Sequence, residues 1–321
     1  MDVALIAFPG VEPLDVVGPA SVFAKAAALR PGAYRVLIGS PQGGCLAAAG
    51  GISLADTVPL EALPDALDTV LVAGGEEPAL RAAIQAGVPA WIAGVSGCRR
   101  LGSVCTGAFL LAAAGLLDGR RAATHWRAAA RLQALFPRVR VDPAPIYLFD
   151  RFYTSAGVTA GIDLALALVA ADHGQPLATA VARELVVYAQ RAGGQGQYSR
   201  ALLAQATASP KLAELIDWML ENLDAAVDVA GLAARAGMAE RTFARAFVAA
   251  TGLPPGRFLM LARLERAKSL LETTPWPLAR IAAECGFGSV DALQRAFRVH
   301  GQGTPGGQRR RFGAGMPSAR T

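Results

Sequence analysis

The chain has 321 residues, of which 53% are hydrophobic and 17% charged. This composition excludes a disordered protein, because so apolar a chain can bury enough surface to fold, and the length indicates two or three domains. No run of about 20 apolar residues is free of charge, and no signal sequence opens the chain. We therefore expect a cytoplasmic protein without a membrane span.

The formal net charge is +6, and it is unevenly distributed. From Arg235 onward there are 14 Lys and Arg against 5 Asp and Glu, whereas the preceding residues are slightly acidic. Basic residues gathered in one domain favour a nucleic-acid partner over a membrane. The four cysteines show no CxxC spacing, so the sequence predicts reduced thiols, no metal site and no cofactor; they are Cys45, Cys98, Cys105 and Cys285.

The first two thirds of the chain alternate short β-rich runs with helical patterns. Near-continuous apolar strands separated by helices are typical of a parallel sheet covered on both faces, so we predict an α/β fold. The predicted strands are 3–8, 34–39, 69–75, 101–105 and 152–157. The predicted helices include 17–29, 107–114, 160–173 and 176–191.

One turn of this sheet carries possible chemistry. In the segment LGSVCTGAFLL a buried strand ends at Cys105, and Gly107 opens a helix. A residue at such a sharp strand-to-helix turn lies near backbone N–H groups, and a helix N-terminus lowers the pKa of a cysteine thiol. We therefore expect Cys105 to be the most reactive of the four thiols. The alternative is that Cys105 is a small buried hydrophobic residue.

The same region resembles the DJ-1/PfpI family, a flavodoxin-like parallel-sheet sandwich. The resemblance lies in FPGVEPLDVVGPASVF, SVCTGAFLLAAAGLLDGRRAATHW and TSAGVTAGIDLALALVAADHG. It implies a ligand-binding site made by Asp15, Cys105 and Thr106, with His125 and Trp126 as further pocket residues. The alternatives are that Asp15 caps the helix that follows it and that His125 only starts a helix.

The resemblance leaves two activities open for this site. Protease-like members carry Cys-His-Gly, whereas this chain has Cys105-Thr106-Gly107 and lacks the adjacent base. This difference predicts a domain that is not an enzyme, with no catalytic residue beyond the candidate reactive cysteine Cys105. The pairing of Asp15 with Cys105 is also similar to the acid and nucleophile of isocyanide hydratases, so a cysteine hydratase or hydrolase is the alternative.

After a Gly-, Gln- and Ser-rich linker, the chain contains the same helical pattern twice. VDVAGLAARAGMAERTFARAF breaks at Gly237, and LARIAAECGFGSVDALQRAF breaks at Gly286 and Gly288. Each copy reads as helix, tight turn and helix, and one long helix joins them. The second helices have apolar backs and polar fronts, as a helix in the major groove of DNA requires. A helical bundle with solvated charged faces is the alternative, and the duplication argues against it.

The C-terminal third resembles the DNA-binding domain of AraC-type transcriptional regulators, an all-α domain with two helix-turn-helix units. The match runs through LAARAGMAERTFARAF, RLERAKSLLETT, IAAECGFGSVDALQRAF and TPGGQRRRF. By position it implies DNA contacts from Arg241, Ala244, Arg245, Val290, Asp291, Gln294 and Arg295. The second helix of each unit is the recognition helix, which contacts the DNA bases. Ala239 replaces the usual Ser, so the first recognition helix lacks the expected N-cap.

The two resemblances together identify the chain as a member of the GlxA family of transcriptional regulators. We expect a ligand-sensing and dimerisation domain over 1–190, a linker over 191–210, a DNA-binding domain over 211–314 and a tail over 315–321. The resemblance implies sequence-specific binding to promoter half-sites on double-stranded DNA, with activation as the expected sense. The implied partners are a small nitrogen-containing effector, RNA polymerase and a second copy of the chain bound through the N-terminal domain.

Overall fold

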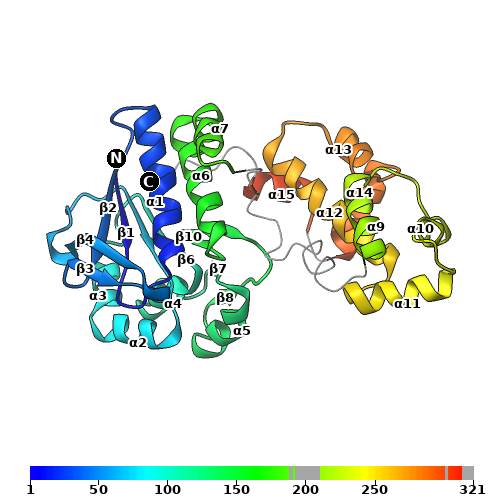
Figure 1. Cartoon of the computed structure of the whole chain (residues 1–321). Coiled ribbons are helices and arrows are strands. Elements are labelled where there is room, and N and C mark those ends of the chain that lie inside the picture. Colours follow the sequence, from blue (N-terminus) through cyan, green and yellow to red (C-terminus); the bar gives the residue numbers. More distant parts are fainter. Residues whose placement is uncertain (188–190, 192–209, 301–302, 313–321) are drawn as a thin grey trace. The chain divides into compact units, whose positions relative to one another are not determined.

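The computed structural model describes residues 1–187, 191, 210–300 and 303–312 (Figure 1). These residues form two compact units, one within 1–191 and the other within 210–312. The predicted linker lies outside the described residues except at its ends, Arg191 and Pro210, and the predicted tail lies wholly outside them. No described helix is both long and apolar enough to cross a membrane.

The first unit is built on an eight-stranded sheet in the order β3-β4-β2-β1-β5-β6-β10-β9. The six central strands run parallel, and β3 and β9 pair antiparallel at the edges, so the predicted parallel sheet is confirmed. All five predicted strands are present, whereas the hairpin strands β3, β4 and β9 were not predicted. The bounds are β1 Asp2–Ile6, β2 Arg35–Ser40, β3 Gly44–Ala47, β4 Ser53–Pro59, β5 Thr69–Val72, β6 Arg100–Val104, β9 Tyr147–Asp150 and β10 Phe152–Ser155.

Helices cover the sheet in two groups, as Figure 1 shows: α1, α6 and α7 pack together, and α2, α3 and α4 form the other group. The central strands β5, β6 and β10 are buried throughout, as strands covered on both faces must be. The bounds are α1 Pro13–Leu29, α2 Glu77–Gln85, α3 Val88–Gly94, α4 Ala108–Ala113, α5 Trp126–Leu135, α6 Thr159–His173 and α7 Gln175–Glu184. Strands β7 (Arg121–Ala122) and β8 (Arg140–Val141) form a small second sheet.

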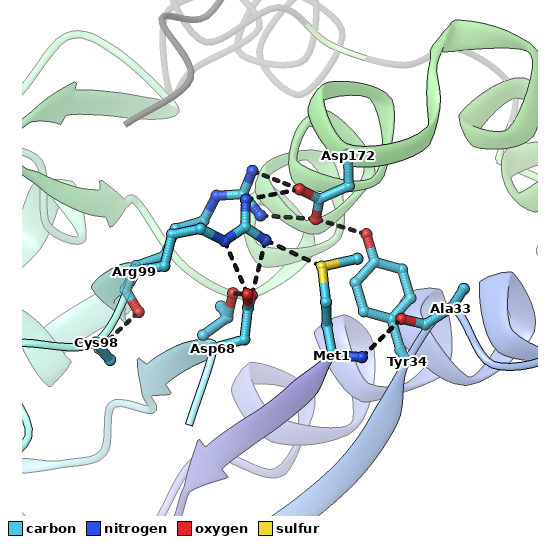
Figure 2. Close-up of polar contacts among 9 residues, drawn as sticks. Met1, Ala33, Tyr34, Asp68, Cys98, Arg99 and Asp172 are labelled. Carbon is cyan, nitrogen blue, oxygen red and sulfur yellow. Dashed lines mark hydrogen bonds and ion pairs between the residues drawn. The ribbon is translucent and has the colours of Figure 1, made fainter. Parts of the chain in front are cut away.

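A buried ionic cluster closes the N-terminal edge of the sheet, where the parallel strands begin (Figure 2). Both terminal nitrogens of the Arg100 guanidinium, Nη1 and Nη2, donate to Asp172 at the end of α6, at 2.7 and 2.8 Å, and the hydroxyl of Tyr34 donates to the same carboxylate at 2.7 Å. Arg99 adds a bond to Asp172 and pairs with Asp68. Burial opposes ionisation, but the bonds from Arg100 and Arg99 hold the pKa of Asp172 at about 2.

The second unit is all-helical and contains the two predicted helix-turn-helix pairs, α10–α11 and α13–α14, joined by α12. The bounds are α9 Pro210–Glu221, α10 Val229–Arg235, α11 Glu240–Thr251, α12 Pro255–Thr273, α13 Leu278–Glu284, α14 Val290–Val299 and α15 Pro305–Phe312. Gly237 and Gly286 take positive φ values of 65° and 70° at the two turns, a conformation that favours glycine. The predicted duplication is therefore confirmed at the level of the fold.

Candidate functional site

The candidate site of the first unit lies at the carboxyl edge of the sheet, where β6 ends at Val104 and Cys105 follows with φ 57°. A single 3₁₀ turn, Cys105–Gly107, then leads into α4. Glycines surround the turn because nothing larger fits: a Cβ at Gly157 would overlap that of Cys105, and one at Gly107 would collide with the carbonyl oxygen of Val72. The predicted sharp strand-to-helix turn is confirmed, and the positive φ of Cys105 shows that it is strained.

Asp15 lies fully buried beside this turn and holds two loops in place. One carboxylate oxygen accepts the N–H of Gly74 at 3.1 Å, after β5, and the other accepts the N–H of Val158 at 2.6 Å, before α6. The alternative role of Asp15 as an N-cap was wrong. Helix α1 begins earlier than predicted, at Pro13, and the side chain of Glu12 caps it.

The pKa of the Cys105 thiol beside Asp15 differs from the prediction. Burial raises the pKa of Asp15 to about 6. Burial, followed by the charge of Asp15, raises the pKa of the Cys105 thiol well above its usual range, so the predicted lowering was wrong. The physical reason is that the thiol is only 8% exposed and faces a carboxylate, while α4 starts three residues later and has only six residues.

Thr106 is tied to the loop after β5. Its hydroxyl oxygen accepts the N–H of Gly75 at 2.8 Å and donates to the carbonyl of the same residue at 2.8 Å. The structure therefore brings Asp15, Cys105 and Thr106 together, as predicted. Sequence reasoning missed the backbone groups of Gly74, Gly75 and Val158 that complete the arrangement.

His125 and Trp126 lie at the start of α5. The preceding residue, Thr124, donates its hydroxyl to the carbonyl of Cys105 at 2.9 Å, which tethers this segment to the turn. His125 takes the N-cap position without a capping bond, and its ring lies 5.5 Å from that of Trp126. Burial and then Arg127 lower the pKa of His125. Within the described residues no hydrogen bond joins His125 to Asp15 or Cys105, so the imidazole is not placed as their base.

The two recognition helices of the second unit present the predicted side chains. On α11, Arg241 and Arg245 are exposed and Ala244 is half-buried, while Phe243 and Phe247 are fully buried on the opposite face. Ala239 takes the N-cap position without a side-chain bond, as expected. On α14, Asp291 and Arg295 are exposed, Val290 and Gln294 are half-buried, and the helix is capped by Ser289, whose hydroxyl accepts the N–H of Ala292 at 3.1 Å.

Two other arginines of this unit stack on tryptophan rings. The guanidinium of Arg235 lies 3.8 Å from the ring centre of Trp218, and that of Arg280 lies 3.7 Å from Trp276. Each stack holds the first helix of a helix-turn-helix unit. Both arginines remain exposed, so their charges still face solvent while their guanidinium planes lie over a tryptophan ring.

Comparison with known proteins gives two family matches. Residues 1–171 match the DJ-1/PfpI family, and residues 232–311 match a helix-turn-helix domain. The unit around Cys105 is also similar to a solved ThiJ/PfpI family protein from Pseudomonas syringae, with 25% identity, a TM-score of 0.54, and coverage of 74% of this chain and 90% of that one.

Curated relatives carry names of regulators. The chain is 31% identical to the HTH-type transcriptional regulator CdhR of Pseudomonas aeruginosa over 95% of this chain and 90% of CdhR, and 30% identical to GlxA of Rhizobium meliloti over 88% of this chain and 86% of GlxA. It is 34% identical to GbdR of P. aeruginosa over 63% of this chain, and the match spans only 55% of GbdR.

An enzyme is similar to the first unit alone: the isonitrile hydratase of Pseudomonas putida is 30% identical over 52% of this chain. CdhR and GlxA, whose matches extend over 95% and 88% of this chain, are both named as regulators. The chain therefore belongs to the GlxA-type family of transcriptional regulators, in which a DJ-1/PfpI domain is followed by an AraC-type helix-turn-helix domain.

Proposed function

We propose that this protein recognises a specific DNA sequence through both recognition helices and responds to a small nitrogen-containing effector bound by a non-catalytic DJ-1/PfpI domain. The observation that carries the proposal is the pair of exposed cationic faces, with Arg241 and Arg245 on α11 and Arg295 on α14, in a chain that also holds a buried acid and thiol. Activation through RNA polymerase and a homodimer of N-terminal domains belong to the same proposal.

A positively charged nitrogen suits the surroundings of Asp15. The carboxylate is fully buried, and burial raises its pKa to about 6. A cationic group bound beside it would offset the cost of keeping that charge out of water. His125 and the half-exposed Trp126 are the further residues that we assign to the effector site.

The contacts of Asp15 also support transmission towards the DNA-binding unit. Asp15 accepts the N–H of Val158, and α6 starts at the next residue, Thr159. The guanidinium of Arg191 donates to the Thr159 hydroxyl at 2.7 Å and to the buried carboxylate of Asp163 at 2.6 and 2.9 Å. Arg191 is the first residue of the predicted linker, so an effector that moves Val158 would act where that linker begins.

DNA binding by side chains on both helices is tested with Arg241→Ala and Arg295→Ala. Each should lose about 5- to 150-fold in affinity for a selected target and relax the sequence preference at one position only. Arg280→Ala is the control, since Arg280 stacks on Trp276. Footprinting and binding at several salt concentrations are the measurements. A loss that is equal on target and random DNA would contradict base reading by that side chain.

A hydratase is the second candidate function, because Asp15 and Cys105 lie side by side. Against it stands the raised pKa of the thiol, and among the described residues no hydrogen bond links His125 to Cys105. We expect turnover of isonitriles, amides and α-oxoaldehydes to stay below about 1 per second. Faster turnover by the wild type that disappears in Cys105→Ala would establish the enzymatic alternative.

A further inference from the structure

The second unit has two separate hydrophobic cores. The first is formed by α9, α10, α11 and the start of α12, and on α12 it ends at Leu259. The buried residues of the second begin on α12 at Leu264 and continue through α13 and α14, with the partly buried Met260 and Leu261 packed against them. Each recognition helix is thus held by its own core. Because α12 is the shared element, other contacts are needed to fix the rotation of one core relative to the other.

Arg263 lies on α12 at the boundary between the two cores. Its Nε donates to the carbonyl of Leu223 at 2.7 Å and its Nη2 donates to the carbonyl of Ala225 at 2.9 Å, both in the loop between α9 and α10. A Cβ at Gly286, in the turn between α13 and α14, would collide with the Leu223 carbonyl and lie 2.8 Å from Arg263 Nε. The guanidinium therefore contacts the loop that leads into α10, the first helix of one helix-turn-helix pair. It also lies beside the turn between α13 and α14 of the other pair.

This contact is polar, because the guanidinium meets two backbone carbonyls. A cleft of about 350 Å³ lies beside it, within the DNA-binding unit. Its lining includes Asp224, Val227, Arg263 and Phe287. Burial lowers the pKa of Arg263, so its charge is partly withdrawn from water and the two carbonyls compensate for the lost hydration. The planar guanidinium meets the two carbonyls with two nitrogens held in a fixed fork, whereas the three donors of a lysine ammonium share one nitrogen at the end of a flexible chain and do not reproduce that geometry.

We propose that Arg263 is a positioning residue for DNA recognition, which fixes the angle between the two helix-turn-helix units and so sets the spacing of the two DNA segments that they accept. The proposal rests on the proposed function, in which both recognition helices contact DNA. Two recognition helices read major-groove segments about one helical turn apart, and a change in the angle between them changes the spacing that fits.

The experiment uses the full chain and a DNA duplex selected from a random library with the wild-type protein. One base pair is then inserted or deleted between the two protected segments, and affinity is measured for each spacing. We expect Arg263→Met to lose about tenfold on the selected spacing, about the value of one hydrogen bond to a charged group, and to discriminate less among spacings. Arg266→Met is the matched control, since Arg266 is exposed three residues along the same helix.

Arg263→Lys keeps the charge and should also relax the spacing preference, which separates positioning from electrostatic attraction. Gly286→Ala disturbs the same contact from the other side and should behave alike if Arg263→Met does not fold. Two results in folded Arg263 variants would overturn the positioning role of Arg263: a wild-type ratio of affinities across spacings, or an equal loss of affinity at every spacing. Either result would leave recognition of two DNA segments standing. A wild-type protein that is indifferent to spacing would overturn two-segment recognition itself.

Discussion

At Cys105 two physical effects oppose each other. A helix N-terminus favours a thiolate, whereas burial and a neighbouring carboxylate oppose it. Here α4 starts after an intervening 3₁₀ turn, while Asp15 lies against the thiol, and the pKa of Cys105 rises. The strained turn thus supplies the geometry of a nucleophile without the charge state of one.

We therefore expect Cys45, which is exposed, to be alkylated faster than the buried Cys105 and Cys285. The thiolate is the reacting form, so access favours Cys45, and burial disfavours Cys105 and Cys285 by raising the pKa values of their thiols. Mass-spectrometric labelling with iodoacetamide between about pH 6 and 9 ranks the thiols, with Cys45→Ser as the control for assignment. Cys105 reacting first would show that its thiolate is favoured in the fold.

Asp15 should make the stability of the first unit depend on pH. Its folded pKa of about 6 lies above the usual 3.8, so the carboxyl contributes stability below about pH 4 that is lost as the pH rises through about 6. The loss is roughly 3 kcal/mol. In Asp15→Asn this dependence should disappear, although the variant also loses hydrogen-bond acceptors and is less stable near neutral pH.

The measurement is urea unfolding from pH 4 to 7, followed by the fluorescence of Trp91 and Trp126. Wild type and variant are compared in a background with Trp218→Phe and Trp276→Phe, so that the signal comes from the first unit. Equal pH slopes in the two proteins would show that the Asp15 carboxyl is not perturbed by folding.

The two recognition helices differ in how they begin. The side chain of Ser289 caps α14, whereas Ala239 occupies the same position of α11 in extended backbone geometry without a capping bond. An N-cap serine contributes about 1 kcal/mol. Ala239→Ser should therefore stabilise α11, and Ser289→Ala should destabilise α14 by a similar amount.

Hydrogen–deuterium exchange on peptides from α11 and α14 measures each effect locally. Slower exchange of α11 in Ala239→Ser and faster exchange of α14 in Ser289→Ala are expected, with the other helix as the internal control. No change at α11 would mean that the packing of Phe243 and Phe247, and not the cap, determines how often the start of that helix opens.

Across the whole molecule, an effector can change DNA affinity only through unequal affinity for two states. With coupling of the usual size, about 1 to 3 kcal/mol, a saturating effector should alter DNA affinity about 5- to 150-fold, and DNA should alter effector affinity by the same factor. A thermal-shift screen of amino acids, polyamines and quaternary amines supplies the ligand, and a hit should be lost in Asp15→Ala.

The contact between Arg191 and Asp163 offers a sharper test of that coupling. The double variant Arg191→Met, Asp163→Asn removes both charges, so no buried charge is left unpaired. We expect it to bind the effector normally and to lose most of the effector's influence on DNA affinity. Sedimentation of both proteins with and without ligand shows whether dimerisation changes. Full coupling in the double variant would exclude this route through α6.

The sequence alone determined the architecture of both units. Hydrophobic periodicity depends on neighbours along the chain, so five of the six parallel strands and the duplicated helix-turn-helix could be predicted. Alanine has no side-chain acceptor, so the missing cap at Ala239 could be predicted as well. The resemblance to the DJ-1/PfpI family likewise implied that Asp15 would lie beside Cys105. The edge hairpins were missed because short, half-exposed strands give a weak periodic signal.

Only the tertiary structure decided the charge states and the polar contacts between distant segments. The pKa of Cys105 depends on burial and on Asp15, which lies 90 positions earlier in the chain. Backbone groups such as the N–H of Val158 and the carbonyl of Leu223 belong to every residue alike, so no side-chain pattern marks them. Their roles at Asp15 and Arg263 follow from proximity in three dimensions, which local sequence does not encode.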